Sequence, residues 1–141
     1  MLRISHELVR RISLHGEQTY PEECCGALYG TEAEGVRTVL YVQEISNTQD
    51  VNRERRFSLT ADQYRSAERK AKELHLTLLG FYHSHPDHPA EPSQFDLEHA
   101  FPWFSYIIQN ISGGNAGLLT SWILDETRMR FNEQTVSEET T

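Results

Sequence analysis

Two histidines, a serine and an aspartate follow one another at spacings that suit a metal site. The run from Gly80 to Ala100 reads GFYHSHPDHPAEPSQFDLEHA. His83 and His85 stand two apart after an apolar stretch, and alternate residues of a strand point to the same face. Ser93 and Asp96 stand three apart, a spacing that makes residues neighbours on a helix. Two imidazoles, one carboxylate and one open position are the ligand set of a catalytic zinc site.

The elements that must position these side chains are a strand and a short helix. Residues 76–82 (LTLLGFY) are apolar and bounded by polar residues, which predicts a buried strand. Residues 93–100 are predicted to form a short helix, with Pro92 before it and Pro102 after it. If that helix folds back over the end of the strand, Asp96 reaches both histidines. An H-x-H pair alone is weak support for a metal site, but the full pattern is hard to reach by chance.

This run resembles the signature of the JAMM/MPN+ family of zinc metalloproteases, and the resemblance covers the chain roughly from its first helix to Phe131. It implies one zinc ion held by His83, His85 and Asp96. The segment PEECCG at residues 21–26 is similar to the P-x-E-x-C-G context of the family's catalytic glutamate. The resemblance therefore implies that Glu23 is the catalytic base, with Glu22 as the adjacent alternative.

Ser93 is placed to hydrogen-bond the attacking water or the developing oxyanion, because its hydroxyl is too weak a ligand to compete for the metal. The resemblance also implies a fold: a single α/β domain with a mixed, curved sheet flanked by helices, the architecture shared with cytidine deaminases. GFYHSHPDHPA followed by SYII is similar to the short bacterial branch that acts on ubiquitin-like sulfur carrier proteins. The implied activity is hydrolysis of a peptide or isopeptide bond at the carrier's C-terminal Gly-Gly tail.

Three other interpretations stay open at this point. The first is a zinc hydrolase with a different peptide substrate, and the second is a non-catalytic MPN-type interaction module. The third, a deaminase, is disfavoured because its signature needs H-x-E and P-C-x-x-C, which this chain lacks. Cys24 and Cys25 are alternative soft ligands, although buried, reduced thiols are the expected state. His88 lies beside the site in the turn, where an exposed loop histidine is expected.

Composition limits the partners. The 141 residues fit one domain, and the net charge of −8, from 21 acidic and 13 basic residues, argues against a nucleic-acid ligand. Basic residues cluster only at 53–56 and on the helix that follows. The sequence contains no apolar run of about 20 residues and no signal peptide at its start. We therefore expect a cytoplasmic protein with no membrane partner.

The rest of the chain predicts alternating strands and helices. In order, we expect a helix over 5–20 capped by Ser5, strands over 25–30 and 36–45 joined by a hairpin turn at 31–35, a polar loop over 47–56, a helix opened by a capping box at 60–63, a strand over 103–108, a loop over 111–117, and a final strand pair over 118–124 and 129–131. In the resembled family the region equivalent to 47–56 borders the substrate groove. The domain is expected to span residues 1–133, and residues 134–141 to form a polar, disordered tail.

Overall fold

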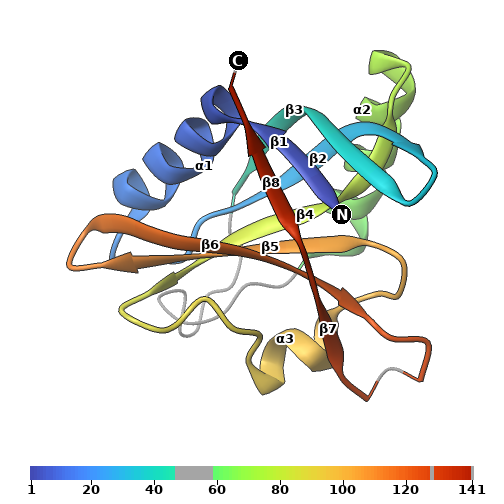
Figure 1. Ribbon diagram of the computed structural model, residues 1–141. Helices are drawn as coiled ribbons and strands as arrows, with labels where there is room; N and C mark the ends of the chain where they lie inside the picture. Colours follow the sequence, from blue (N-terminus) through green and yellow to red (C-terminus); the bar gives the residue numbers. More distant parts are fainter. Residues whose placement is uncertain (47–58, 128, 141) are drawn as a thin grey trace.

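Eight strands form one strongly curved sheet with both parallel and antiparallel pairs (Figure 1). The computed structural model describes residues 1–46, 59–127 and 129–140. Its strands are β1 (Leu2–Ser5), β2 (Cys25–Ala33), β3 (Val36–Ile45), β4 (Thr77–Pro86), β5 (Ser105–Ser112), β6 (Asn115–Leu124), β7 (Phe131–Gln134) and β8 (Val136–Glu139), and its helices are α1 (His6–Thr19), α2 (Ala61–Leu74) and α3 (Gln94–His99). The strand order is β7-β6-β5-β4-β2-β3-β1-β8. The expected α/β domain with a mixed, curved sheet flanked by helices is confirmed.

The curvature brings the two ends of the strand order together. β7 and β8 are the first and last strands of the order, yet a single residue, Thr135, joins them. β8 pairs in parallel with β1, with Leu2 opposite Val136, and the Leu2 amide donates to the Thr135 carbonyl at 2.8 Å. In Figure 1 β7 and β8 form one dark red band that crosses the molecule beside β1. The sheet is therefore close to a barrel.

The expectation of a disordered tail from residue 134 is wrong. Gln134 is the last residue of β7, and residues 136–139 form β8, which is hydrogen-bonded along β1. The segment is polar because it lies at the surface, where only part of each side chain contacts the core. The domain therefore extends to residue 139 and does not stop at 133.

Two hydrophobic cores pack on opposite faces of the central strands, and each is covered by a helix. α1 begins at Ser5, whose side chain accepts from the Leu8 amide, and it buries Ile12 against the first core. α2 begins at Thr60 with the predicted capping box and buries Ala67 and Ala71 against the second. Both helices and their N-caps were predicted correctly. The second face is important for the candidate site, because His83 and His85 lie on it.

Several strand boundaries differ from the prediction. Residues 25–33 are the second strand and not the first, because β1 precedes α1. Residues 111–117 are not an open loop, since β5 and β6 run to a tight turn at Gly113 and Gly114, both with positive φ. The strand expected from Trp103 begins at Ser105, because Trp103 has a φ of 79°. The loop predicted over 47–56 lies outside the described residues.

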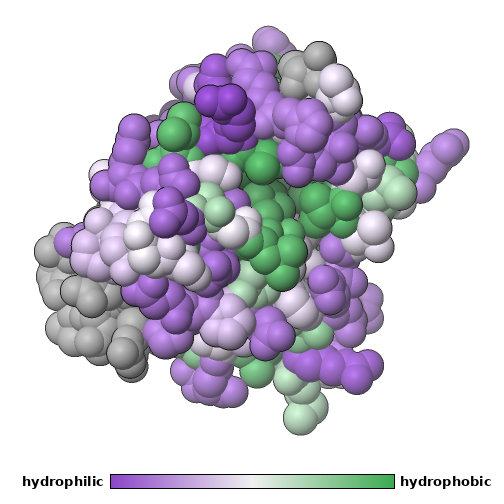
Figure 2. Space-filling view, turned by 60° about the vertical axis from the view of Figure 1, so that its left-hand side comes forward, coloured by the Kyte–Doolittle hydropathy of each residue, from purple (hydrophilic) through white to green (hydrophobic). Residues whose placement is uncertain are grey.

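The outer surface is mainly hydrophilic on the face shown in Figure 2, where apolar side chains form a band between hydrophilic ones. Such a surface agrees with the net charge of −8. Among the described residues, no helix combines the length and the apolar character needed to span a bilayer.

Candidate metal centre

β4 delivers both histidines from the middle of the sheet, as its apolar sequence predicts. It lies between β2, with Cys25 opposite His83, and β5, with Ile108 beside His83. Side chains alternate along the strand, so His83 and His85 point to the face where Phe81 joins the second core. The two histidines are buried, with exposed fractions of 3% and 6%. Pairing on both sides leaves their backbone little freedom to move.

α3 brings Asp96 to the same point. Its N-cap is Ser93, whose Oγ accepts from the Asp96 amide at 3.0 Å, while the Ser93 amide donates to Asp96 Oδ2 at 2.9 Å. This reciprocal capping box fixes both the start of the helix and the orientation of the carboxylate. The predicted short helix is confirmed, and it has a second use because its third residue points at the histidines.

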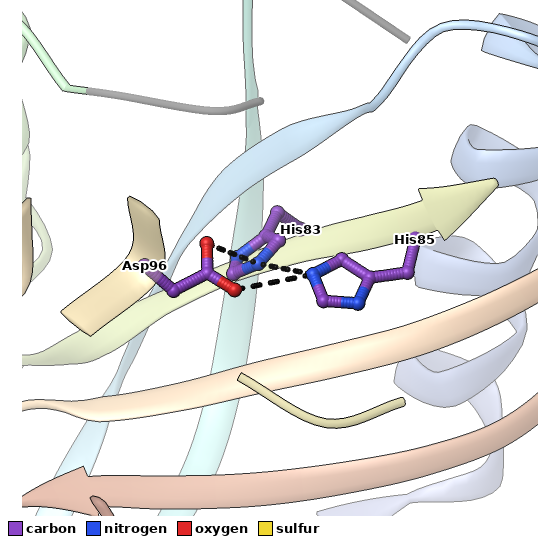
Figure 3. Close-up of side chains that lie close together, drawn as sticks. All are labelled: His83, His85 and Asp96. Carbon is purple, nitrogen blue, oxygen red and sulfur yellow. Dashed lines mark hydrogen bonds and ion pairs between the residues drawn. The ribbon is translucent and has the colours of Figure 1, made fainter. Parts of the chain in front are cut away.

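The three side chains converge so that one nitrogen of each histidine lies close to the Asp96 carboxylate (Figure 3). His83 Nε2 lies 3.2 Å from His85 Nε2 and 3.2 Å from Asp96 Oδ1, and His85 Nε2 lies 3.2 Å from Asp96 Oδ2. Ligands placed tetrahedrally around zinc, at their usual distances from the ion, stand about 3.3 Å apart. These distances and a donor set of two imidazole nitrogens and one carboxylate oxygen therefore both fit a zinc ion.

A hydrogen bond sets the ring of His85. Its Nδ1 donates to the carbonyl of Pro89 at 2.8 Å, which makes Nε2 the nitrogen with a free electron pair. A metal-binding histidine typically donates its other ring nitrogen in this way, and the bond fixes both tautomer and orientation. His85 is therefore already prepared as an Nε2 ligand.

The Asp96 carboxylate is strongly favoured in its charged form. Burial opposes its ionisation, but the charge of His83 and hydrogen bonds from His83 and the Ser93 amide outweigh burial. Together they hold the pKa of Asp96 well below its usual range. The carboxylate is available as a ligand throughout the physiological pH range.

Glu23 lies beside this cluster and its environment differs from that of Glu22. Glu23 is buried, with 2% of its surface exposed, whereas Glu22 is exposed. Burial, and then the charge of Asp96, raise the pKa of Glu23 from its ordinary 4.5 to about 9. Strongly shifted carboxyl groups of this kind are frequent at catalytic positions. Of the two adjacent glutamates, Glu23 is the one that reaches the site.

Two cavities adjoin the cluster, and different residues of the site line each of them. The larger, about 320 Å³, is lined by Glu23, His85, His88, Ser93 and neighbouring loop residues. The smaller, about 20 Å³, reaches His83 and Asp96. Its other walls are mostly apolar and come from Leu59, Phe81, His99, Ala100, Phe101, Tyr106, Ile108 and Phe131. All five predicted site residues thus border one region of the molecule, and His88 lies in it as an exposed loop residue.

The cysteines take no part in the cluster. Cys24 packs in the first core, and Cys25 Sγ contacts the Ile45 carbonyl at 3.2 Å. Both are free, buried thiols, as expected. Burial raises the pKa of Cys24 to about 11 and that of Cys25 higher still, so neither readily forms the thiolate that zinc requires.

Sequence reasoning missed the residues that support the ligands. Pro89 contributes a backbone carbonyl, and the loop around it is held by Asn110 and Thr120 from β5 and β6. Every residue has a backbone carbonyl, so the residue type does not indicate which carbonyl accepts a hydrogen bond from a ligand. β6 is also far from the motif in the sequence. From the sequence, the aromatic residues that line the smaller cavity are predicted only to be core residues. In these cases, only the folded structure shows that the residues lie beside the candidate site.

Comparison with known proteins identifies relatives across the whole chain. Residues 5–125 match the family described as prokaryotic homologs of the JAB domain. A solved protein from Salinibacter ruber is 40% identical over 97% of this chain and 91% of its own, with a TM-score of 0.76. One from Desulfitobacterium hafniense is 24% identical over 100% and 94%, with a TM-score of 0.87. A JAB1/MPN domain protein from Archaeoglobus fulgidus is 16% identical over 96% and 97%, with a TM-score of 0.61, and it is similar in fold. No curated protein matches.

Proposed function

Because the chain belongs to the family of prokaryotic homologs of the JAB domain, we propose that it is a zinc-dependent hydrolase of peptide or isopeptide bonds. His83, His85 and Asp96 would hold the ion, and Glu23 and Ser93 would act beside it. The observation that carries this proposal is the convergence of three buried side chains: the two Nε2 atoms lie 3.2 Å apart, and each lies 3.2 Å from one oxygen of the Asp96 carboxylate. A zinc ion bound by such a set acidifies water and polarises a carbonyl group.

Glu23 supplies the proton transfer in this mechanism. Its carboxylate takes a proton from the attacking water and delivers it to the departing nitrogen. With a pKa of about 9 the carboxyl is protonated at neutral pH, but a dication beside Asp96 offsets the negative charge that contributes to this shift. Zinc binding and ionisation of Glu23 therefore favour each other.

Ser93 has two functions in the proposal. Its Oγ accepts from the Asp96 amide, so its own hydroxyl hydrogen remains available for the cavity that it lines with Glu23 and His85. A hydrogen bond from there to the developing oxyanion would stabilise the transition state. The same hydroxyl would thus hold the backbone of Asp96 through its oxygen and contact the substrate through its hydrogen.

The substrate that we propose is the C-terminal Gly-Gly tail of a ubiquitin-like sulfur carrier protein. The similarity of GFYHSHPDHPA to the branch that acts on such carriers supports this assignment. The cavity of about 20 Å³ beside His83 and Asp96 supports it independently. A volume of this size holds about one water-sized group, so glycine fits next to the bond that is cut and a large side chain does not.

The test is intact mass spectrometry of a bacterial carrier extended past its Gly-Gly by one cysteine, before and after incubation with the zinc-loaded protein. We expect loss of the cysteine, abolished by a chelator and slowed about 10²- to 10⁴-fold by Glu23→Gln. Glu22→Gln, an exposed neighbour, should cut at the wild-type rate. A carrier whose last glycine is replaced by leucine should stay intact.

Each negative result rejects a different part of the proposal. If the wild type binds zinc and leaves every carrier intact, the substrate assignment is wrong. If Glu23→Gln cuts as fast as the wild type, Glu23 is not the proton carrier. If the wild type binds no zinc, the metal centre itself is rejected.

A further inference from the structure

The loop that follows His85, residues 87–92, is fixed by side chains from several elements. We call it the site loop. Asp87 accepts hydrogen bonds from the Tyr20 hydroxyl at 2.6 Å and from the Gly113 amide at 2.8 Å. The next three carbonyls each accept one side-chain hydrogen bond: His88 from Asn110 Nδ2 at 2.6 Å, Pro89 from His85 Nδ1 at 2.8 Å, and Ala90 from Thr120 Oγ1 at 2.7 Å. The Pro89 carbonyl, which orients a ligand, is therefore held on both sides.

Thr120 is the more deeply placed of the two flanking anchors. Thr120 and Ala90 are both buried, so a missing bond between them would leave a carbonyl without a partner. The Thr120 hydroxyl accepts from Trp122 Nε1 at 2.8 Å. Its one hydrogen then points to the Ala90 carbonyl at 2.7 Å, in preference to the Ile108 carbonyl at 3.3 Å. The indole, the hydroxyl and the loop carbonyl form a directed chain.

We propose that Thr120 is a positioning residue of the metal centre: its hydroxyl sets the site loop so that the Pro89 carbonyl holds His85 with Nε2 toward the ion. The carbonyls of Pro89 and Ala90 belong to two adjacent peptide units, which are joined at the Ala90 Cα. Each unit is planar and stiff, so fixing the Ala90 carbonyl fixes this shared Cα and limits where the Pro89 carbonyl can lie. This inference rests on the proposed role of His85 as a zinc ligand.

The experiment compares zinc affinity in Thr120→Val and Thr120→Ser by competition with a chromophoric chelator. Valine keeps the shape and removes the hydroxyl, so we expect affinity to fall about tenfold, at the low end of the loss seen for residues that support ligands. Serine keeps the hydroxyl and should restore affinity to near the wild-type value. Thr38→Val, the same chemical change on β3, is the matched control and should bind zinc normally.

A second readout needs no metal. Nitrogen-15 shifts of the His85 ring in the metal-free proteins report which nitrogen carries the hydrogen, and Thr120→Val should show a smaller Nδ1–H population than the wild type. If the wild type binds no zinc, the proposed function fails but this shift still tests the link from Thr120 to His85. If Thr120→Val keeps both the zinc affinity and the nitrogen-15 shifts of the wild type, this inference is overturned while the proposed function stands. It is also overturned if Thr120→Ser or Thr38→Val loses as much zinc affinity as Thr120→Val.

Discussion

At the scale of single residues, Glu23 is held in an environment that opposes its charge. Its surroundings are buried and include the carboxylate of Asp96, and both raise its pKa. In the metal-free protein a carboxyl whose pKa is about 9 when folded and near 4.5 when unfolded favours folding below pH 4.5. That contribution is lost as the pH rises from about 4.5 toward 9.

The direction of this pH dependence gives a prediction for Glu23→Gln, because glutamine has no carboxyl group to titrate. Between pH 5 and pH 8 the free energy of unfolding of the wild type should fall relative to that of the variant, by up to about 1.4 kcal/mol per pH unit. Urea unfolding of both proteins at the two pH values, with a chelator present, measures the difference. Glu22→Gln should follow the wild type. Parallel pH dependence of the wild type and Glu23→Gln would show that Glu23 is not desolvated as described.

The sequence identifies the candidate metal ligands better than the residues that support them. His83, His85, Ser93 and Asp96 lie within a short run, where strand and helix periods predict which side chains meet. Glu23 is distant from them, and only its resemblance to a family context selects it. The Pro89 carbonyl and the Thr120 hydroxyl belong to no motif, because their roles depend on how β6 lies behind the site loop.

At the scale of elements, two helices in the described part of the chain begin with a capping box, and the two boxes lie in different surroundings. Ser93 caps α3 and also orients Asp96, whereas Thr60 caps α2 through Gln63, away from the cluster. Loss of either cap should cost a similar amount of stability, about 1 kcal/mol. Only the first should affect the metal, because only its box includes a ligand.

The prediction is therefore a contrast between Ser93→Ala and Thr60→Ala. Both should lower the free energy of unfolding by about 1 kcal/mol in urea titrations, while zinc affinity should fall severalfold in Ser93→Ala alone. Ser93→Thr keeps the capping oxygen and should restore affinity. Equal zinc affinities in the two alanine variants would mean that the box does not orient Asp96.

At the scale of the whole molecule, β8 completes the sheet. It covers the outer side of β1, half-buried Val136 packs against the first core, and its glutamates pair with β1 and α1. The pairs are Glu139 with Arg3, at 3.1 Å, and Glu138 with His6. These surface ion pairs contribute little, so strand pairing and apolar contact supply most of the stability.

Deletion of residues 135–141 should therefore destabilise the protein by roughly 2 kcal/mol or more, because a half-buried valine and four strand pairs are lost. Thermal unfolding measures the loss, and light scattering should show more self-association through the uncovered edge of β1. A protein that lacks only residues 140–141 is the control. If both deletions melt at the wild-type temperature, β8 does not stabilise the fold.

The overall architecture was easier to predict than the strands β1 and β8. The central strands are apolar and the two long helices carry clear N-caps, so their sequences specify them locally. β1 has four residues that run directly into α1, and its pattern is too short to separate from the helix. β8 is polar and gains its structure only from β1. Strands that depend on a distant partner carry little local signal.

The pairing of β1 with β8 also means that β1 can complete its hydrogen bonds only late in synthesis. The β1 residues leave the ribosome before the rest of the domain, but their partners at 136–139 emerge only after almost the whole domain has been made. α1 and the β2–β3 hairpin involve neighbours in sequence and can form early. Until residues 136–139 emerge, β1 therefore has an unpaired edge, and a nascent-chain chaperone has its longest opportunity to bind there.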